Sequence, residues 1–163
     1  MDGMWKAAIR QQFVAAIDML ENAMRDCSEA LWGDGARQPQ FWYLVYHTLF
    51  FLDLYLSGSR ECFAPPAPFT LDELDPAGVM PDRVYAKAEL QAYLEHGRRK
   101  CRETIDALTA ERAARFCRFA SIEGSFLELL LYNLRHVQHH AAQLNLILRQ
   151  ETDAAPRWVA RSG

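Results

Sequence analysis

Apolar residues in the first thirty positions recur at intervals of three and four, the spacing of an amphipathic helix with one buried face. They are Ile9, Phe13, Ile17, Leu20 and Met24. The pattern predicts a helix from Met4 to about Ala30, and Gly33-Asp34-Gly35 is expected to end it.

A second helix is predicted from Pro39, whose missing N–H suits a first helical turn, to Leu56, with Ser57-Gly58 as its stop. Residues 41–56 are the most apolar stretch of the chain, but they include His47, Thr48 and Asp53. A membrane span needs about 20 residues with few or no charges. The stretch is therefore expected to be a buried helix, and no membrane partner is expected.

Residues 59–81 contain five prolines and predict a long irregular crossover. A third helix is expected to begin between positions 82 and 86 and to continue to about Leu108. Residues 109–120 are small and charged and are expected to hold a short helical turn. A fourth long helix should begin between positions 121 and 125 and end near Gln150.

Patterns typical of strands are nearly absent. Four helices with one long and two shorter connections predict an all-α fold, a four-helix bundle with a long crossover between its second and third helices. Residues 1–163 are expected to form one domain, with its core at 4–150 and a C-terminal tail at 151–163 whose Trp158 docks on the bundle.

The composition of 163 residues, 50% apolar and 24% charged, is sufficient for one substantial core. A formal charge of −3 argues against nucleic acid as a partner. His96 and the basic run at 98–102 are expected to lie mostly on a solvated face. The chain lacks CxxC pairs and an N-terminal signal pattern, so we expect reduced cysteines and a cytoplasmic location. The cysteines are Cys27, Cys62, Cys101 and Cys117.

Polar residues form a row along the fourth predicted helix, directly beside its apolar seam. The seam comprises Leu130, Leu134, Val137, Ala141, Leu144 and Leu148. The neighbouring row has the same spacing, one position earlier each time, and its middle members are Asn133, His136, His140 and Gln143. Polar groups that face a core are costly unless they have partners. The row therefore indicates a bound ligand or a polar network.

His136 and His140 lie four residues apart, so their imidazoles are about 40° apart around the helix axis and can converge on one ion. His139 points about 100° away from His140 and is expected to be exposed, although a His136/His139 pair is also geometrically allowed. His47 on the second helix meets apolar surface whichever way it faces and is the candidate third ligand. Three neutral histidines leave a tetrahedral ion one open position, as in catalytic zinc sites.

In such a site Asn133 and Gln143 would orient the imidazoles. Several other motifs are excluded. Val137 stands where the HExxH metalloproteases have a glutamate, so a general base of that type is absent. No glutamate stands three residues before any of the five histidines, which excludes a Glu-x-x-His di-iron site. GxSxG, P-loop and GxGxxG motifs are also absent.

The two histidine-bearing stretches, residues 43–56 and 129–144, together resemble the DinB-like superfamily of metal-dependent proteins, over roughly residues 4–150. The resemblance implies a four-helix bundle in which His47, His136 and His140 bind one divalent ion, zinc or nickel. It also implies a homodimer and, in some members, transferase or isomerase activity that uses low-molecular-weight thiols. No residue here matches a substrate-binding motif.

The favoured hypothesis is a metal-dependent enzyme of thiol S-transferase or hydrolase type that acts on a small molecule through the three histidines. The alternative is a non-catalytic metal-binding or small-molecule-binding bundle in which the ion is structural. A third reading is a metal-free scaffold in which the inward histidines are satisfied by one another, by Asn133 and Gln143, or by water.

Overall fold

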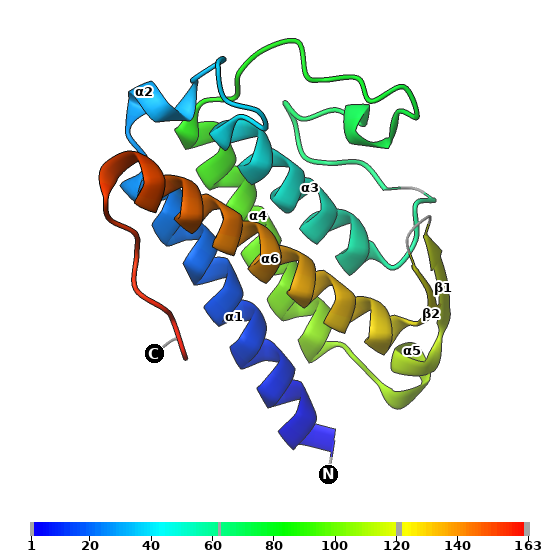
Figure 1. Ribbon diagram of the computed structural model, residues 1–163. Coiled ribbons are helices and arrows are strands. Elements are labelled where there is room, and N and C mark those ends of the chain that lie inside the picture. The colour runs from blue at the N-terminus through cyan, green and yellow to red at the C-terminus, as the bar shows by residue number, and fades with distance from the viewer. Residues whose placement is uncertain (1, 62, 120–121, 162–163) are drawn as a thin grey trace.

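Residues 2–61, 63–119 and 122–161 are described in the computed structural model of the chain. Within these ranges four long helices make up most of the structure. They are α1 (Asp2–Asp26), α3 (Phe41–Ser57), α4 (Lys87–Asp106) and α6 (Phe126–Thr152). Helices α1 and α3 each pack against both α4 and α6, and α6 lies between α1 and α3 in Figure 1. The predicted, mainly helical architecture is confirmed.

The prediction of one continuous helix from Met4 to Ala30 is wrong. Helix α1 ends at Asp26, and a separate short helix, α2 (Glu29–Trp32), follows it. Ser28 causes the break because its side-chain oxygen accepts a hydrogen bond from the Leu31 backbone N–H at 3.2 Å and so caps a new helix.

Helix α3 begins at Phe41 with Gln40 as its N-cap, so Pro39 precedes the helix and is not in its first turn as predicted. The helix ends as expected at Ser57, where Gly58 takes a left-handed conformation with φ of 71°. Thirteen of its 17 residues are buried, which confirms the expected core helix. Among the described residues, no helix combines the length and the apolar character that crossing a bilayer requires.

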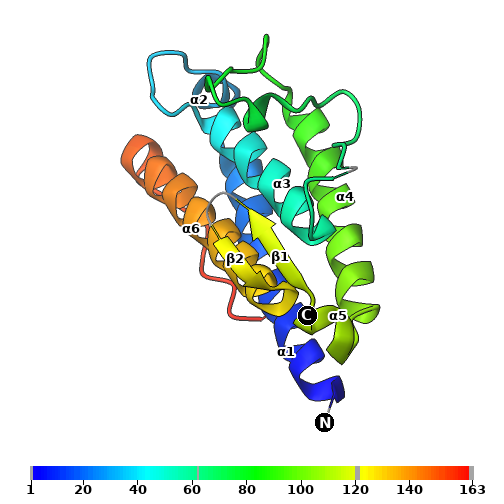
Figure 2. The ribbon, with the colours of Figure 1, turned by 90° about the vertical axis from the view of Figure 1, so that its right-hand side faces the viewer.

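We call the segment from Gly58 to Ala86 the crossover segment. Its described residues, all but Cys62, are irregular except for the 3-10 turn η1 (Asp72–Leu74). Three buried aromatic residues, Phe63, Phe69 and Tyr85, join it to the core. The Phe69 ring stacks on Tyr93 of α4 with ring centroids 4.4 Å apart. These contacts hold the crossover segment beside α3 and α4 (Figures 1 and 2) and thereby fix the position of η1.

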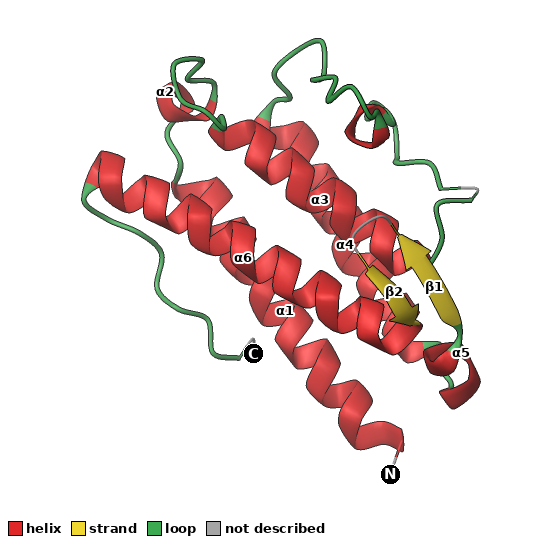
Figure 3. Ribbon diagram, turned by 45° about the vertical axis from the view of Figure 1, so that its right-hand side comes forward, coloured by secondary structure: helices red, strands yellow, loops and turns green. Residues whose placement is uncertain are grey.

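The predicted helical turn between the third and fourth long helices is α5 (Ala110–Ala114). An antiparallel pair of strands that the sequence pattern did not predict follows this helix and packs on α6 (Figure 3). The strands are β1 (Phe116–Phe119) and β2 (Ile122–Ser125). The hairpin is a small addition to a mainly helical structure, which remains consistent with the predicted all-α class. Strands of four residues give too few alternating positions for a period-two pattern to stand out.

A buried polar cluster joins α3 to α4. The Asp53 side chain is 1% exposed and accepts hydrogen bonds from Lys100 and from the Tyr93 hydroxyl, the latter at 3.1 Å. Lys100 also donates to the Ser57 hydroxyl at 2.7 Å. The Nε2 atom of His96 lies 3.4 Å from the same carboxylate, so His96 is not a purely solvated residue as predicted. The cluster surrounds the Asp53 carboxylate with donors from α4.

The basic run at 98–102 is also more structural than predicted. Arg98 donates to Asp18 and to Glu21 of α1, each at 2.6 Å, and its side chain is 18% exposed. Arg99 and Arg102 are exposed as expected. The run therefore supplies contacts from α4 to both α1 and α3 because Arg98 and Lys100 point to different neighbours.

Three cysteines are buried and free of disulfide bonds, as predicted. The same prediction for Cys62 falls outside the described residues. The three are Cys27, Cys101 and Cys117. Burial raises the pKa of the Cys101 thiol to about 12 and that of Cys27 to about 11, so both are poor nucleophiles. The C-terminal tail contacts the helices through Val159, whose N–H lies 3.2 Å from the Met19 sulfur. Trp158 was expected to dock but is 68% exposed.

Candidate metal centre

The structure brings His47, His136 and His140 together on the seam between α3 and α6. The centroid of the His47 ring lies 5.3 Å from that of His136 and 4.9 Å from that of His140, and the two α6 rings are 4.5 Å apart. All three side chains are half-buried. Helical spacing places the α6 pair on one face, and the packing of α3 against α6 supplies the third ring.

The ring nitrogens have a spacing that suits a single ion. One nitrogen from each ring lies within 4.8 Å of the other two. The Nε2 atoms of His47 and His136 are 3.4 Å apart. Zn–N bonds of about 2.0–2.1 Å place the nitrogens around a tetrahedral ion about 3.3–3.4 Å apart. The His47–His136 pair therefore already has the separation that a bound ion requires.

Glu73 fixes the orientation of His47. Its Oε2 atom lies 2.7 Å from Nδ1 of His47, and the Glu73 side chain is only 3% exposed. An ionised carboxylate accepts hydrogen bonds and cannot donate them, so an ionised Glu73 would place the proton of a neutral His47 on Nδ1 and leave a lone pair on Nε2. Metal-bound histidines commonly have such a carboxylate on the nitrogen away from the metal.

Gln143 has the same role for His140. Its side-chain oxygen lies 2.7 Å from Nδ1 of His140 and accepts the Nδ1 proton, which leaves Nε2 free. This contact confirms the expectation for Gln143. The expectation for Asn133 is wrong because its amide nitrogen donates instead to the Leu52 backbone oxygen at 3.0 Å, between α6 and α3.

The imidazoles of His136 and His140 are held in the neutral form. Burial, followed by the neighbouring His140 and His47 rings, lowers the pKa of His136 from 6.5 to about 3. Burial also lowers the pKa of His140, to about 4, against the opposing effect of its hydrogen bond to Gln143. Neutral imidazole is the form that binds metals.

His136 contributes one donor to the centre and has one ring nitrogen without a partner among the described residues. Its Nδ1 atom is buried and has no hydrogen-bond partner within the described part of the chain. Coordination of an ion through Nε2 would place the proton of the neutral ring on Nδ1, so this atom lacks a described partner with or without an ion and does not by itself indicate a metal. One ring nitrogen from each histidine lies within 4.8 Å of the other two, and Glu73 and Gln143 contact only the Nδ1 atoms of His47 and His140, so the residues present fit the ligand set of a divalent transition metal.

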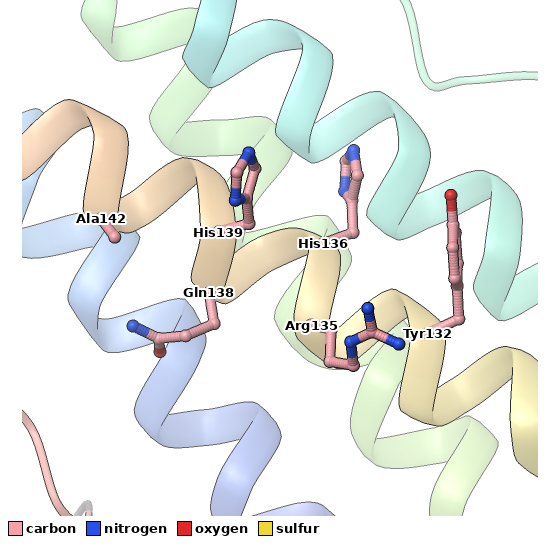
Figure 4. A pocket seen from close by; sticks show the side chains of 6 residues that line it. All are labelled: Tyr132, Arg135, His136, Gln138, His139 and Ala142. Atoms are coloured by element: carbon pink, nitrogen blue, oxygen red, sulfur yellow. The ribbon is translucent and has the colours of Figure 1, made fainter.

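The surroundings of the rings are aromatic on one side and open on another. The Phe51 ring lies 4.8 Å from His47 and 5.6 Å from His136, and Tyr55 lies 6.0 Å from His136. His136 also borders a surface depression of about 530 Å³ on the outer side of α6 (Figure 4). As predicted, His139 is exposed, and it lines this depression without joining the three-ring cluster.

Sequence reasoning did not identify Glu73. The residue lies in η1 within the proline-rich crossover segment, where no hydrophobic period relates a position to a neighbouring helix. The acidic pair Asp72-Glu73 was visible in the sequence, but its contact with α3 depends on how Phe63 and Phe69 anchor the loop.

Comparison with known proteins identifies the family of the chain. A family model described as the DinB superfamily matches residues 12–144, which include η1 and all three histidines. No significant match was found among curated proteins or among solved structures. Because the family match covers most of the chain and includes all the residues of the centre, the protein belongs to the DinB superfamily.

Proposed function

We propose that the chain binds one divalent ion, zinc or nickel, through Nε2 of His47, His136 and His140, and that it is a metal-dependent enzyme acting on a small molecule. In this proposal the four long helices form a four-helix bundle, and the crossover segment connects its second and third members. The reaction is of thiol S-transferase or hydrolase type. The observation that carries the proposal is the 3.4 Å separation of two Nε2 atoms beside a third neutral imidazole.

The chain's own residues would prepare the centre in two ways. Glu73 and Gln143 hold the Nδ1 protons of His47 and His140, which keeps both Nε2 lone pairs directed away from these partners. Phe51 and Tyr55 cover the aromatic side of the rings and limit water there. When bound, a divalent ion with three neutral ligands supplies Lewis-acid activation of a thiol or water.

The alternative is a structural ion that joins α3 to α6 without catalysis. One feature favours it, since the three histidines come from two helices that already pack together. Two features favour the enzyme. Structural zinc sites usually have four protein ligands, whereas the group found among the described residues has three. The depression beside His136 also provides room for a substrate.

Metal content tests the centre directly. Untagged protein is purified, and bound zinc, nickel, iron and manganese are measured by mass spectrometry for the wild type and for His47→Ala and His136→Ala. His139→Ala is the matched control because it removes an exposed imidazole from the same helix. We expect one ion per chain in the wild type and in the control, and loss of the ion in both other variants. An unchanged metal content in His47→Ala would refute the site.

Chelation then separates the two functions. The metal-loaded protein is assayed with a panel of thiols and electrophiles and with hydrolysable esters and amides, and far-UV circular dichroism is recorded before and after metal removal. Loss of turnover with an intact helical spectrum, restored by added metal, supports the enzyme. Unfolding on chelation supports the structural ion.

A further inference from the structure

The depression beside the candidate metal centre is formed by one face of α6. Its lining residues are Tyr132, Arg135, His136, Gln138, His139 and Ala142. These positions follow the three-and-four spacing of a helical face, so the depression runs along the helix from the ring of His136. Figure 4 shows the rings of Tyr132, His136 and His139 extending from α6 toward α3, whereas the Arg135 side chain leaves the helix on another side. The depression is open at the surface and has a volume of about 530 Å³.

The residues that line the depression include a basic side chain and no acidic one. Arg135 is the cation of the group, and none of the six residues carries a carboxylate. Arg135 is exposed, and in the described ranges no acidic side chain lies within ion-pair distance of it. Arg98 differs from Arg135 because its guanidinium group forms ion pairs with two carboxylates of α1. The five N–H donors of Arg135 are therefore available to a ligand.

Glu73, the acidic residue that contacts the centre, lies on the side of the His47 ring away from His136. Glu73 is 3% exposed, and its carboxylate faces Nδ1 of His47, the nitrogen opposite to the one that approaches His136. Imidazole ligands carry no negative charge, so the charge of a bound divalent ion would not be compensated by the three side chains that hold it. Of the three histidines only His136 borders the depression, and an ion bound at the centre would place positive charge on one side of this ring while Arg135 lines the depression on the other.

We infer that the depression binds a small molecule that carries a carboxylate or a similar anionic group, and that Arg135 holds this group while the opposite end of the molecule reaches the three-histidine centre. The inference deepens the proposed function and rests on it, because it assigns the substrate class of that same site. A guanidinium fork matches a carboxylate with two parallel hydrogen bonds, so it fixes orientation as well as adding affinity. The Tyr132 hydroxyl and the Gln138 amide provide further neutral hydrogen-bonding groups in the same lining.

A second basic residue offers an internal control. Arg149 lines a neighbouring groove that shares Gln138 and Ala142 with the depression but does not include His136. Arg135 and Arg149 are 14 residues apart on α6, which corresponds to about 21 Å along the helix axis. A molecule small enough to join Arg135 to the centre does not reach Arg149. Charge at Arg149 should therefore have little effect on binding.

The test compares two small thiols, one that ends in a carboxylate and one that ends in a hydroxyl group. Binding of 3-mercaptopropionate and of 3-mercaptopropanol to the zinc-loaded protein is measured by calorimetry at low salt, for the wild type and for Arg135→Gln, Arg135→Lys and Arg149→Gln. We expect the wild type to bind the carboxylate-bearing thiol about tenfold more tightly, as a charge-assisted hydrogen bond provides. Arg135→Gln should lose this preference. Arg135→Lys should keep part of it, and Arg149→Gln should keep all of it.

The outcomes separate this inference from the proposed function. Equal affinity for both thiols in a wild type that holds one zinc ion per chain overturns the anion site and leaves the metal centre standing. Failure to hold zinc, together with an Arg135-dependent preference for 3-mercaptopropionate, overturns the metal centre and supports the anion site. A preference that is the same in Arg135→Gln as in the wild type assigns the effect to another group and overturns the inference.

Discussion

Substitution of Glu73 by glutamine tests how the crossover segment contributes to the metal centre. The carboxylate is 3% exposed and lies 2.7 Å from Nδ1 of His47. Glutamine has nearly the same shape and can still accept the Nδ1 proton, so the main loss is the negative charge. Charge-assisted hydrogen bonds are roughly twice as strong as neutral ones. Loss of such a partner typically weakens metal binding about 10- to 100-fold, which is about 1.4–2.7 kcal/mol.

The assay is competition for zinc against a chromogenic chelator at pH 7.5, with the wild type and Glu73→Gln measured side by side. Glu123→Gln is the matched control because the same change is made on a β2 side chain that is 62% exposed. Near-identical circular dichroism spectra would establish that all three proteins are folded. Zinc affinities of Glu73→Gln and the wild type that agree within about twofold would refute the tautomer-fixing role that we assign to Glu73.

Three further predictions concern the free energy of unfolding, measured by urea denaturation. Asp53→Ala should lower it by about 3 kcal/mol because a buried ion pair loses one partner. The control Asp106→Ala removes one partner of an exposed ion pair and should lower it by less than about 1 kcal/mol. Similar losses in both variants would contradict a stabilising role for the polar cluster between α3 and α4. Gly58→Ala should lower the free energy of unfolding by more than about 1 kcal/mol, since φ is 71° and the space for a Cβ is filled; an unchanged midpoint would contradict this. In metal-free protein the pKa of His136 is about 3, below the value of 6.5 expected in the unfolded chain. The unfolded state therefore binds more protons at acidic pH, and the free energy of unfolding falls as the pH drops below 6.5. This one group lowers it by up to about 1.4 kcal/mol per pH unit. His136→Gln should show a shallower fall, and equal slopes would contradict the assignment.

The helices and the three-ring cluster could be anticipated because both depend on helical periodicity. His136 and His140 share a face at any point in an α-helix, and they lie beside an apolar seam that must be buried. His47 lies in the most apolar stretch, which the fold buries on α3. The convergence of these rings then required only that the second and fourth long helices pack together, as they do.

The polar contacts between elements were not predictable in the same way. Arg98 and Lys100 are two positions apart in a run that resembles a solvated face, yet they reach α1 and α3 respectively. A charge on a helix is exposed or paired according to which neighbour passes beside it, and periodicity carries no information about that neighbour. The hairpin at 116–125 was missed for a related reason, because its pairing and its packing on α6 stabilise strands that are too short to recognise alone.

The candidate centre therefore combines parts with different structural origins. Its three donors stand on long packed helices, which hold their directions with little freedom. The carboxylate that sets the tautomer of His47 comes from an irregular loop, and the position of that loop depends on Phe63 and Phe69 in the core. Because the loop contacts Nδ1 and leaves Nε2 free, it can tune the affinity of the centre without occupying a ligand position. Variation in the crossover segment can thus change the strength of metal binding while the three histidines stay the same.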